Sequence, residues 1–388
     1  MLLGLALALA FRSDTLTLER ALAEALIRRP RVAVSAAIVA HARGTSQVLG
    51  VIPNPVFQLD RYDAAPERKI YLTQSLNWLF RRAGDQGTGR ALVDRARADS
   101  TAAIAELGRE VRLAFGSLLA RRQELALSTE QRTLADSLLV LAERRLSVGD
   151  IAALDRDQVG QLAALARLAE SRAAEAEQVA AIELKRVIGR TDDGPLVSAG
   201  SLDDGLGAIV ATRPVDVPPN LAAAVADSAA AAGRLRSAQR SQIPALGLRA
   251  GQEAGGDGFV AKSFLGFSIA IPIFSRGREA VAEAAGASRV AAGLAAEARL
   301  DLDARQRAAA VRLEQAQRRA LIARDSLAPI ARRIRAGATR LYEEGRTGIL
   351  PVFEALRGER EVLLGMIDAL AGFQRARADL LALVGRFE

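Results

Sequence analysis

Apolar residues at every second position mark two short segments of the chain as β-strands. One runs from about residue 70 to 78 and the other from about 264 to 271, and each has an apolar face and a small or polar face. Segments at about 55–62 and 245–251, each introduced by a proline, are the expected partner strands. The alternating apolar residues are Ile70, Leu72, Leu76, Trp78, Leu265, Phe267, Ile269 and Ile271.

Apolar residues three and four positions apart predict long helices over most of the remaining chain. They form a first hairpin at about 90–189 and a second at about 278–385. The return arm of the second hairpin has a heptad pattern typical of coiled coils, interrupted by Glu359 and Arg377. Pro329 should kink the outgoing arm, because proline has no N–H to donate to the carbonyl four residues earlier.

The two halves of the chain repeat one unit. Gly149 recurs as Gly345 and Gly189 as Gly385, both 196 positions later, in similar surroundings. Each half has the pattern helix, strand, strand, helix, helix. The sequence therefore predicts a mainly α fold with a small β part, made of a first repeat at 11–189, a linker at 190–219 and a second repeat at 220–388.

Composition supports extended helical hairpins over a compact globule. Aromatic residues make up only 4% of the chain, which is rich in Ala, Leu, Arg and Glu. The net charge of +8 does not indicate nucleic-acid binding, because the arginines alternate with acidic residues along the helices. Residues 1–10 form an apolar run ending in Ala-Leu-Ala, which we interpret as the remnant of a signal peptide.

Chemical motifs point away from catalysis. The chain has no cysteine, and its single histidine, His41, lies in an alanine-rich helix, so we expect neither a metal site nor a cofactor. It also lacks a P-loop, a nucleophile elbow and a complete dinucleotide-binding loop. We therefore predict that the protein is not an enzyme.

Four strands with one apolar face are too few to close a membrane barrel, which needs about eight or more. Closure would require several chains, and side-by-side helical hairpins could continue such a barrel as a helical tube. A strand barrel joined to a helical tube is a duct. Two alternatives remain: a soluble coiled-coil scaffold, which leaves the alternating strands unexplained, and a periplasmic adaptor, which usually has a single central hairpin.

Four motifs resemble those of the TolC-like outer membrane factors, a family of efflux proteins. Each is weak alone, but their order and the duplication make the resemblance specific over about residues 16–385. The Ile52-Pro53-Asn54-Pro55 motif most resembles that of the heavy-metal-cation branch of the family. The motifs are Leu16-Thr17-Leu18-Glu19-Arg20-Ala21-Leu22, Ile52-Pro53-Asn54-Pro55, Ile271-Pro272-Ile273-Phe274-Ser275-Arg276-Gly277-Arg278, and Tyr342-Glu343-Glu344-Gly345 followed by Ile349-Leu350.

The resemblance implies a homotrimer in the bacterial outer membrane with a large periplasmic portion. Each protomer would contribute four strands to a transmembrane β-barrel, with the alternating apolar residues facing lipid, and its hairpins to a periplasmic α-barrel, with 190–219 as an equatorial linker. The assembly would be the passive exit duct of a tripartite efflux system for metal cations or small toxic compounds. Its expected partners are a periplasmic adaptor and an inner-membrane pump.

The resemblance also assigns roles to residues at the two hairpin turns. The turn Val148-Gly149-Asp150-Ile151 and its counterpart, Gly345 to Ile349 with Gly348, would contact the adaptor. Asp155 and Glu354 would narrow the pore, while Pro351 stands where a further acid is usual. Tyr342 and Arg346 would bond neighbouring helices in the closed state of the gate.

Overall fold

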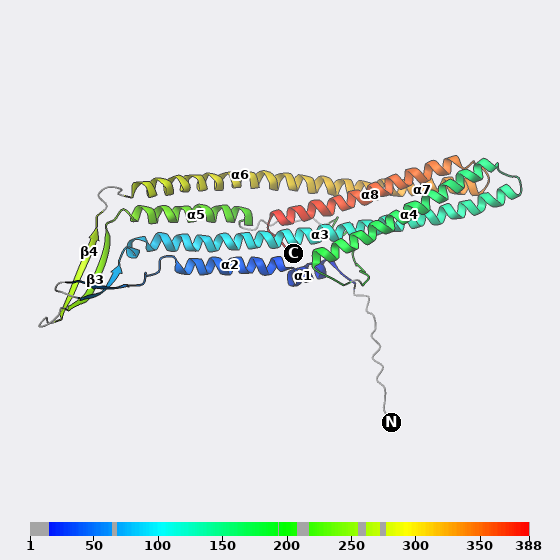
Figure 1. Cartoon of the computed structure of the whole chain (residues 1–388). Coiled ribbons are helices and arrows are strands. Elements are labelled where there is room, and N and C mark those ends of the chain that lie inside the picture. The colour runs from blue at the N-terminus through cyan, green and yellow to red at the C-terminus, as the bar shows by residue number, and fades with distance from the viewer. Residues whose placement is uncertain are drawn as a thin grey trace, which may run out of the picture. The chain divides into compact units, whose positions relative to one another are not determined.

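The computed structural model describes residues 15–63, 68–192, 194–207, 217–254, 261–271 and 277–387. The predicted signal-peptide remnant at 1–10 lies outside them. In chain order the elements are α1 (Leu18–Arg28), α2 (Pro30–Val48), β1 (Val56–Arg61), β2 (Arg68–Ser75), α3 (Trp78–Ser147), α4 (Ala153–Ile188), α5 (Pro219–Arg240), β3 (Ala245–Ala254), β4 (Lys262–Ala270), α6 (Arg278–Ile322), the π-helical turn η1 (Ala323–Leu327), α7 (Ala328–Glu343) and α8 (Leu350–Leu383) (Figure 1).

The four strands form one antiparallel sheet in the order β1-β2-β3-β4. The β1–β2 hairpin comes from the first half of the chain and the β3–β4 hairpin from the second, so the β2–β3 pairing joins the halves. A mainly helical fold with a small sheet, built from a duplicated unit, is confirmed.

The placement of Trp78 in a strand is wrong, because Trp78 is the first residue of α3. Asn77 ends the strand run. Its carbonyl accepts the N–H groups of Phe80 and Arg81, and its side chain accepts the N–H of Leu246 at 2.9 Å. Only Leu76 and Asn77 therefore separate β2 from the helix, and the apparent alternation through Trp78 crosses an element boundary.

The repeat is visible in the turns that end the hairpin helices. Gly149 and Gly345 have φ values of 77° and 71°, which favour glycine, and each donates its N–H to a carbonyl three residues earlier. The residue after each glycine donates to a carbonyl five residues earlier. Gly189 and Gly385 close the return arms with the same bonds, so four helix ends follow one template.

The expected disturbance near Pro329 takes the form of a π-helical turn. Pro329 is the second residue of α7, and the five residues of η1 directly precede α7. Because Pro329 cannot donate to the carbonyl of Asp325, the α-helical bonding is interrupted there, and the turn widens. The matching arm of the first half, α3, is one uninterrupted helix of 70 residues.

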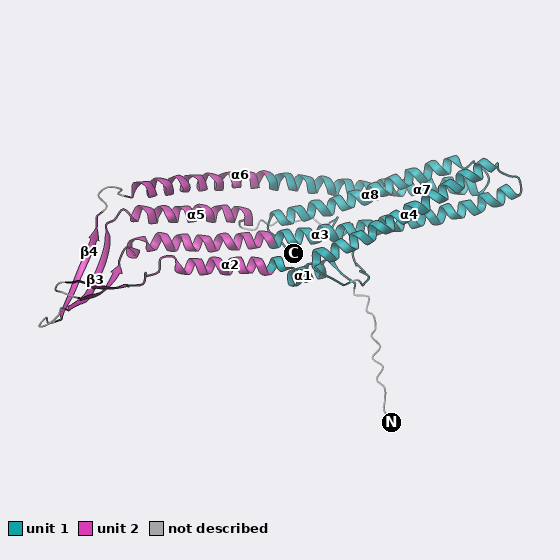
Figure 2. Ribbon diagram, in the orientation of Figure 1, with its two compact units in different colours: residues 1–32, 104–215, 305–388 teal, residues 33–103, 216–304 magenta. Residues whose placement is uncertain are grey.

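The chain divides into two compact units that do not follow the two repeats (Figure 2). Unit 1 comprises residues 1–32, 104–215 and 305–388, and unit 2 comprises 33–103 and 216–304. Each unit therefore contains segments of both sequence repeats. The reason is that the two repeats do not fold separately. The strands of one repeat pair with the strands of the other, and the hairpin of one packs against the hairpin of the other.

In unit 1 the linker packs into the core. Leu202 and Leu206 are fully buried beside the hairpin helices. The side chain of Gln374 on α8 donates to the carbonyl of Leu202 at 2.8 Å, and Gln317 on α6 donates to that of Leu206 at 2.6 Å. These bonds satisfy the carbonyls of an irregular segment and fix it to two helices.

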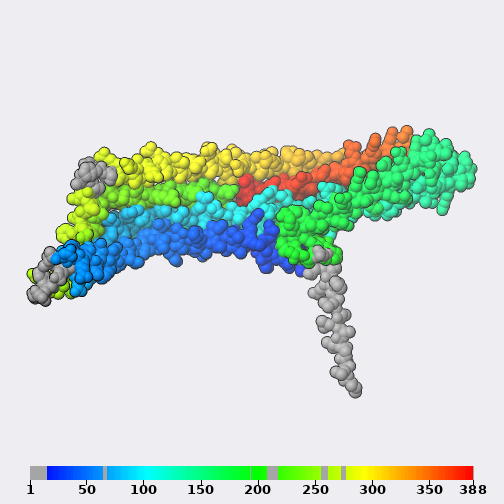
Figure 3. All heavy atoms as spheres, viewed as in Figure 1, coloured from blue at the N-terminus to red at the C-terminus, as the bar shows by residue number. Residues whose placement is uncertain are grey.

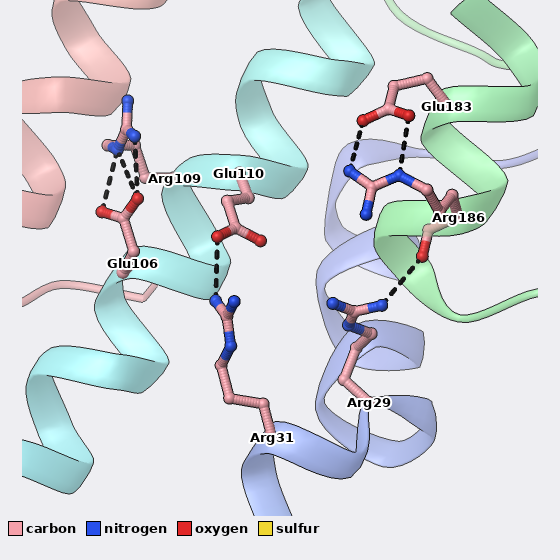
Figure 4. A network of polar contacts seen from close by, with 7 residues as sticks. All are labelled: Arg29, Arg31, Glu106, Arg109, Glu110, Glu183 and Arg186. Atoms are coloured by element: carbon pink, nitrogen blue, oxygen red, sulfur yellow. Dashed lines mark hydrogen bonds and ion pairs between the residues drawn. The ribbon is translucent and has the colours of Figure 1, made fainter.

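Arginine–carboxylate contacts hold the start of the chain to the hairpins in unit 1 (Figure 4). Pro30 separates α1 from α2, and the arginines on either side of it reach different helices. Arg29 donates to the carbonyl of Arg186 on α4 at 3.1 Å, and Arg31 pairs with Glu110 on α3 at 2.9 Å. Nearby, Arg186 is held by Glu183, and Arg109 by Glu106.

Glu24 and Arg190 form the best-enclosed ion pair of this region. Two hydrogen bonds of 2.7 and 2.6 Å join them, and their side chains are only 14% and 13% exposed. The bond from Arg190 lowers the pKa of Glu24 below its ordinary value of 4.5, because it favours the charged carboxylate.

Replacement of Glu24 by Gln should lower the free energy of unfolding by about 2 kcal/mol near neutral pH, since Arg190 loses its counter-charge. The stabilisation in the wild type is complete above pH 4.5 and disappears as the pH falls through the lowered pKa of Glu24. The difference between wild type and variant should therefore shrink in acid. Thermal unfolding followed by circular dichroism across pH tests this, with the exposed Glu361→Gln as control. A difference that grows in acid would contradict it.

In unit 2 two glycines bring α3 and α5 into backbone contact. A Cβ at Gly84 would lie 2.7 Å from the amide nitrogen of Ser237 and 2.8 Å from the carbonyl of Gly233. A Cβ at Gly233 would lie 2.8 Å from the amide nitrogen of Thr88 and 3.0 Å from the carbonyl of Gly84. Both positions exclude any side chain, because the opposing atoms belong to helix backbones.

Gly233→Ala should destabilise the protein by about 1–3 kcal/mol, because the added methyl forces the two helices apart. Gly293→Ala on α6 is the matched control. It meets nothing within 4 Å, so the higher helix propensity of alanine should leave stability unchanged or raised. The midpoint of thermal unfolding should fall in Gly233→Ala and stay unchanged or rise in Gly293→Ala. Equal midpoints in the two variants would refute the close contact between α3 and α5.

Candidate functional site

One face of the sheet in unit 2 is apolar and exposed. The strand register brings apolar residues of all four strands onto this face, including Phe57 and Leu59, which sequence reasoning did not single out. Large exposed apolar surfaces of this kind mark contact with lipid or another protein. The residues are Phe57, Leu59, Ile70, Leu72, Leu246, Leu248, Leu265, Phe267 and Ile269, and all but the half-buried Leu246 are exposed.

The opposite face is polar and carries a row of alternating charges across all four strands. Asp60 lies opposite Lys69, Lys69 opposite Glu253, and Glu253 opposite Lys262. Lys69 and Glu253 form an ion pair of 2.8 Å. The hydroxyl of Tyr71, in the next row, donates to Asp60 at 3.0 Å. We refer to Asp60, Lys69, Glu253 and Lys262 as the charge row.

Glycines keep the polar face open beneath the charge row. Gly251 lies directly opposite Tyr71, and a Cβ there would come within 2.6 Å of the Tyr71 Cβ and 2.8 Å of its Cα. Gly266 in β4 has nothing within 4 Å of the position of a Cβ. These glycines thus leave space on the polar face between its larger side chains, which are Tyr71, Arg249 and Phe264.

The predicted lipid-facing residues divide into two groups. Ile70, Leu72, Leu265, Phe267 and Ile269 share the exposed apolar face. The others flank the strands or leave them: Leu76 follows β2 and is half-buried, Ile271 follows β4 and is exposed, and Trp78 belongs to α3.

Among the described residues, no helix has the length and apolar character needed to cross a membrane. The same residues include no cluster of three or more His, Asp or Glu side chains placed to hold a metal ion.

In unit 1 the tips of the two hairpins share a small core. It is formed by Tyr342, Ile349 and Val352 of the second hairpin with Leu138 and Val159 of the first. The space-filling view shows the second hairpin, in orange, packed against the first, in green (Figure 3). The tips therefore form a joint surface, whose exposed apolar residues are Val148, Leu154 and Leu350.

Arg145 connects the two tips, and sequence reasoning missed it. Its guanidinium lies 4.9 Å from the ring centre of Tyr342, 3.4 Å from a carboxylate oxygen of Asp150, and 3.5 Å from the carbonyl oxygen of Glu343. Its side chain is only 14% exposed. Tyr342 is buried, and its hydroxyl has no hydrogen-bond partner among the described residues, so the cation above its ring is its main polar contact there.

Comparisons with known proteins identify the fold. No protein-family model and no curated protein matches the sequence. Among solved structures, the outer membrane protein VceC of Vibrio cholerae superposes with a TM-score of 0.78 at 18% identity, covering 96% of this chain and 97% of that one. The chain has the fold of the bacterial outer membrane channels.

Two further channel structures agree. The open MtrE outer membrane channel of Neisseria gonorrhoeae gives a TM-score of 0.79 at 15% identity, covering 95% of this chain and 89% of its own. CusC, whose structures are described in terms of transmembrane channel formation, superposes with a TM-score of 0.76 at 14% identity. The match covers 95% of this chain and 92% of that one. The resemblance to TolC-like outer membrane factors is thus confirmed at the level of the fold. The heavy-metal branch stays a prediction.

Within this channel fold, the residues expected at the tips have unequal surroundings. Val148 is 78% exposed, and Gly149, Asp150, Gly345 and Gly348 are also exposed. Ile151 is half-buried. Ile349, the last residue of the second turn expected to contact the adaptor, is buried in the tip core, because its side chain packs with Val352 and Tyr342; the neighbouring Leu350 is exposed.

The expected constriction and gate residues do not meet within one protomer. Asp155 is half-buried and accepts the N–H of Ala152 at 3.3 Å, which caps the start of α4. Glu354 is exposed on α8. Tyr342 is buried under Arg145, whereas Arg346 points to solvent and pairs with Glu344 at 3.3 Å. Their roles in the channel fold stay predictions.

Replacing Arg145 by Gln should loosen the contact between the tips by about 1–2 kcal/mol, because the cation above Tyr342 and the bond to Glu343 are lost. Amide hydrogen exchange should then become faster around Tyr342 and Ile349. Arg144→Gln removes a neighbouring arginine that is exposed and makes no ion pair in the described structure, and it should change nothing. Equal exchange in both variants would show that Arg145 does not hold the tips.

Proposed function

We propose that this chain is one protomer of a homotrimeric exit duct in the bacterial outer membrane. The observation that carries the proposal is the sheet, with an apolar and exposed face and a polar face that bears the charge row. Such a sheet fits a wall between lipid and water, because one face is stabilised by acyl chains and the other by solvent.

The two edges of the sheet support closure by further copies of the chain. β1 and β4 each pair with one neighbour, so each has an unpaired side, which is unfavourable in a membrane. The strand order is antiparallel throughout, so β4 of one copy can pair with β1 of the next and keep the alternation. Three copies would supply about twelve strands, within the range of known membrane barrels.

Exposed apolar stripes on two helices of unit 1 support the same association. Along α4 the residues of the stripe are separated by three or eleven positions. From η1 through α7 the residues of the second stripe are separated by three, four or seven positions. Both sets of spacings place their residues on one face of a helix. The α4 stripe is Leu154, Leu165, Leu168, Val179 and Ile182, and the second is Leu327, Ile330, Ile334 and Leu341, each at least 40% exposed.

The ion pairs that hold α4 and α7 within the hairpins do not involve the residues of the stripes. α4 is joined to α3 by Arg132–Glu170 and by Arg122–Glu177, while α7 is joined to α8 by Arg335, which donates to both oxygens of the buried Glu359. The apolar stripes lie elsewhere on α4 and α7. A second copy of the chain is their natural occupant, because the α4 stripe of one copy would cover the α7 stripe of the next.

Charges beside the stripes favour this pairing. On α7 the exposed Arg333 and Arg340 make no ion pair in the described structure, and on α4 the exposed Glu175 makes none. Opposite charges beside an apolar seam fix the choice and orientation of partner helices in coiled coils.

In this assembly the hairpin tips would face a periplasmic adaptor, and an inner-membrane pump would supply the energy. The exposed Val148 and Leu350 offer apolar anchors beside the flexible glycine turns. Asp155 and Glu354, repeated by threefold symmetry, would line the narrow part of the pore and favour cations there. The exported compounds would be metal cations or small toxic molecules, selected by the pump.

A soluble or periplasmic coiled-coil scaffold is the alternative function. It would explain the hairpins and their stripes. It leaves the apolar face of the sheet without an occupant, and for that reason we favour the duct.

The absence of cysteine allows a direct test by disulfide crosslinking. Leu165 and Ile330 lie at similar distances from the two joined tips, so a variant carrying both Leu165→Cys and Ile330→Cys should form covalent dimers and trimers on oxidation. The same Leu165→Cys combined with Glu361→Cys, on the exposed side of α8, should remain monomeric in denaturing gels.

The crosslinked trimer should be recovered with the outer membrane and should conduct ions in planar lipid bilayers. Recovery as a monomer in mild detergent would contradict the trimer. A folded trimer that never conducts would contradict the duct and leave the scaffold as the better interpretation.

A further inference from the structure

We propose that Arg249 makes the outer end of the duct selective for anionic over cationic solutes. This inference rests on the proposed function, because it takes the polar face of the sheet to line the water-filled pore.

The charges of the charge row neutralise one another. It has two carboxylates, Asp60 and Glu253, and two ammonium groups, Lys69 and Lys262, one on each strand in alternating order. Glu253 is paired with Lys69, and Asp60 accepts the hydroxyl of Tyr71. The row adjoins the loops between the strands of each hairpin, so it forms the rim of the sheet and contributes no net charge.

Arg249 is the charged residue that remains on this face among the described strand residues. It lies on β3 between Thr73 of β2 and Gly266 of β4, and it makes no ion pair in the described structure. It is four residues from Glu253 along the strand, which is roughly 13 Å at ~3.3 Å per residue. Glu253 is already paired with Lys69, and in the described structure neither carboxylate of the row forms an ion pair with Arg249.

The surroundings of Arg249 hold its side chain in place but leave it accessible. Its guanidinium lies over the ring of Tyr71, 5.7 Å from the ring centre, as a diagonal neighbour on the adjacent strand. Arg249 is exposed, and the space above Gly266 beside it is open. An anion could thus approach the guanidinium from the open side without displacing any protein group.

Threefold symmetry would place three such cations at one depth of the pore. The wall outside them faces lipid, which has a low dielectric constant, so their field would be concentrated in the water of the pore. Solutes that carry a carboxylate or another acidic group would pass this ring more readily than metal cations. The ring would therefore favour anionic solutes at the outer end of the pore, whereas the carboxylates of Asp155 and Glu354 would act at its narrow part near the tips.

The test is the ion preference of the purified trimer in planar bilayers, measured as the reversal potential in a potassium chloride gradient. Arg249→Gln should lower the chloride-to-potassium permeability ratio several-fold, and Arg249→Glu should lower it further and make the pore prefer potassium. Arg68→Gln is the control, since it removes an exposed arginine on the apolar-face side of β2 and should leave the ratio unchanged.

Equal permeability ratios in the wild type and Arg249→Glu, with both variants conducting, would overturn the role of Arg249 and leave the duct intact. A change of equal size in Arg68→Gln would also overturn it, because the effect would then follow total charge and not position. If folded trimers of every variant fail to conduct, the duct itself fails, and the inference with it.

Discussion

The pairing of β2 with β3 is the contact on which the arrangement of this chain depends. It is the place where the two halves, separated by a long helical hairpin in the sequence, meet strand against strand. Once that register is set, the residues of the exposed apolar face, from Phe57 to Ile269, lie together, because side chains alternate with a period of two. A shift by one residue would place charges among them. The two-faced sheet therefore depends on one antiparallel pairing between repeats.

The helices meet a different constraint, since few large side chains are available to fill the spaces between them. With aromatic residues at only 4%, close contact is reached where side chains are absent, as between Gly84 and Gly233, or through enclosed arginine–carboxylate pairs such as Glu24–Arg190. Glu359 forms an enclosed arginine–carboxylate pair of this kind inside a hairpin. It interrupts an apolar seam in the sequence, yet it is buried because Arg335 binds both of its oxygens.

Periodicity and duplication were sufficient to predict the strands, the hairpins and the glycine turns, because each depends on local geometry or on a spacing repeated in the sequence. The errors arose where tertiary contacts decide. Trp78 continues an alternating pattern but enters a helix, because Asn77 bonds to both the helix and β3. Ile349 looks like an exposed anchor but fills the tip core, and Arg145 gives no signal in sequence because its partners lie across two hairpins. In the proposed trimer the roles of Asp155 and Glu354 would depend on neighbouring copies of the chain.

The charge row also distinguishes between ways of joining two sheets. Its alternating signs leave a negative group, Asp60, on the β1 edge and a positive group, Lys262, on the β4 edge. When copies related by rotation about a common axis join β4 of one to β1 of the next, the positive edge meets the negative edge and the alternation of signs continues. The row thus favours a ring of copies joined through unlike edges.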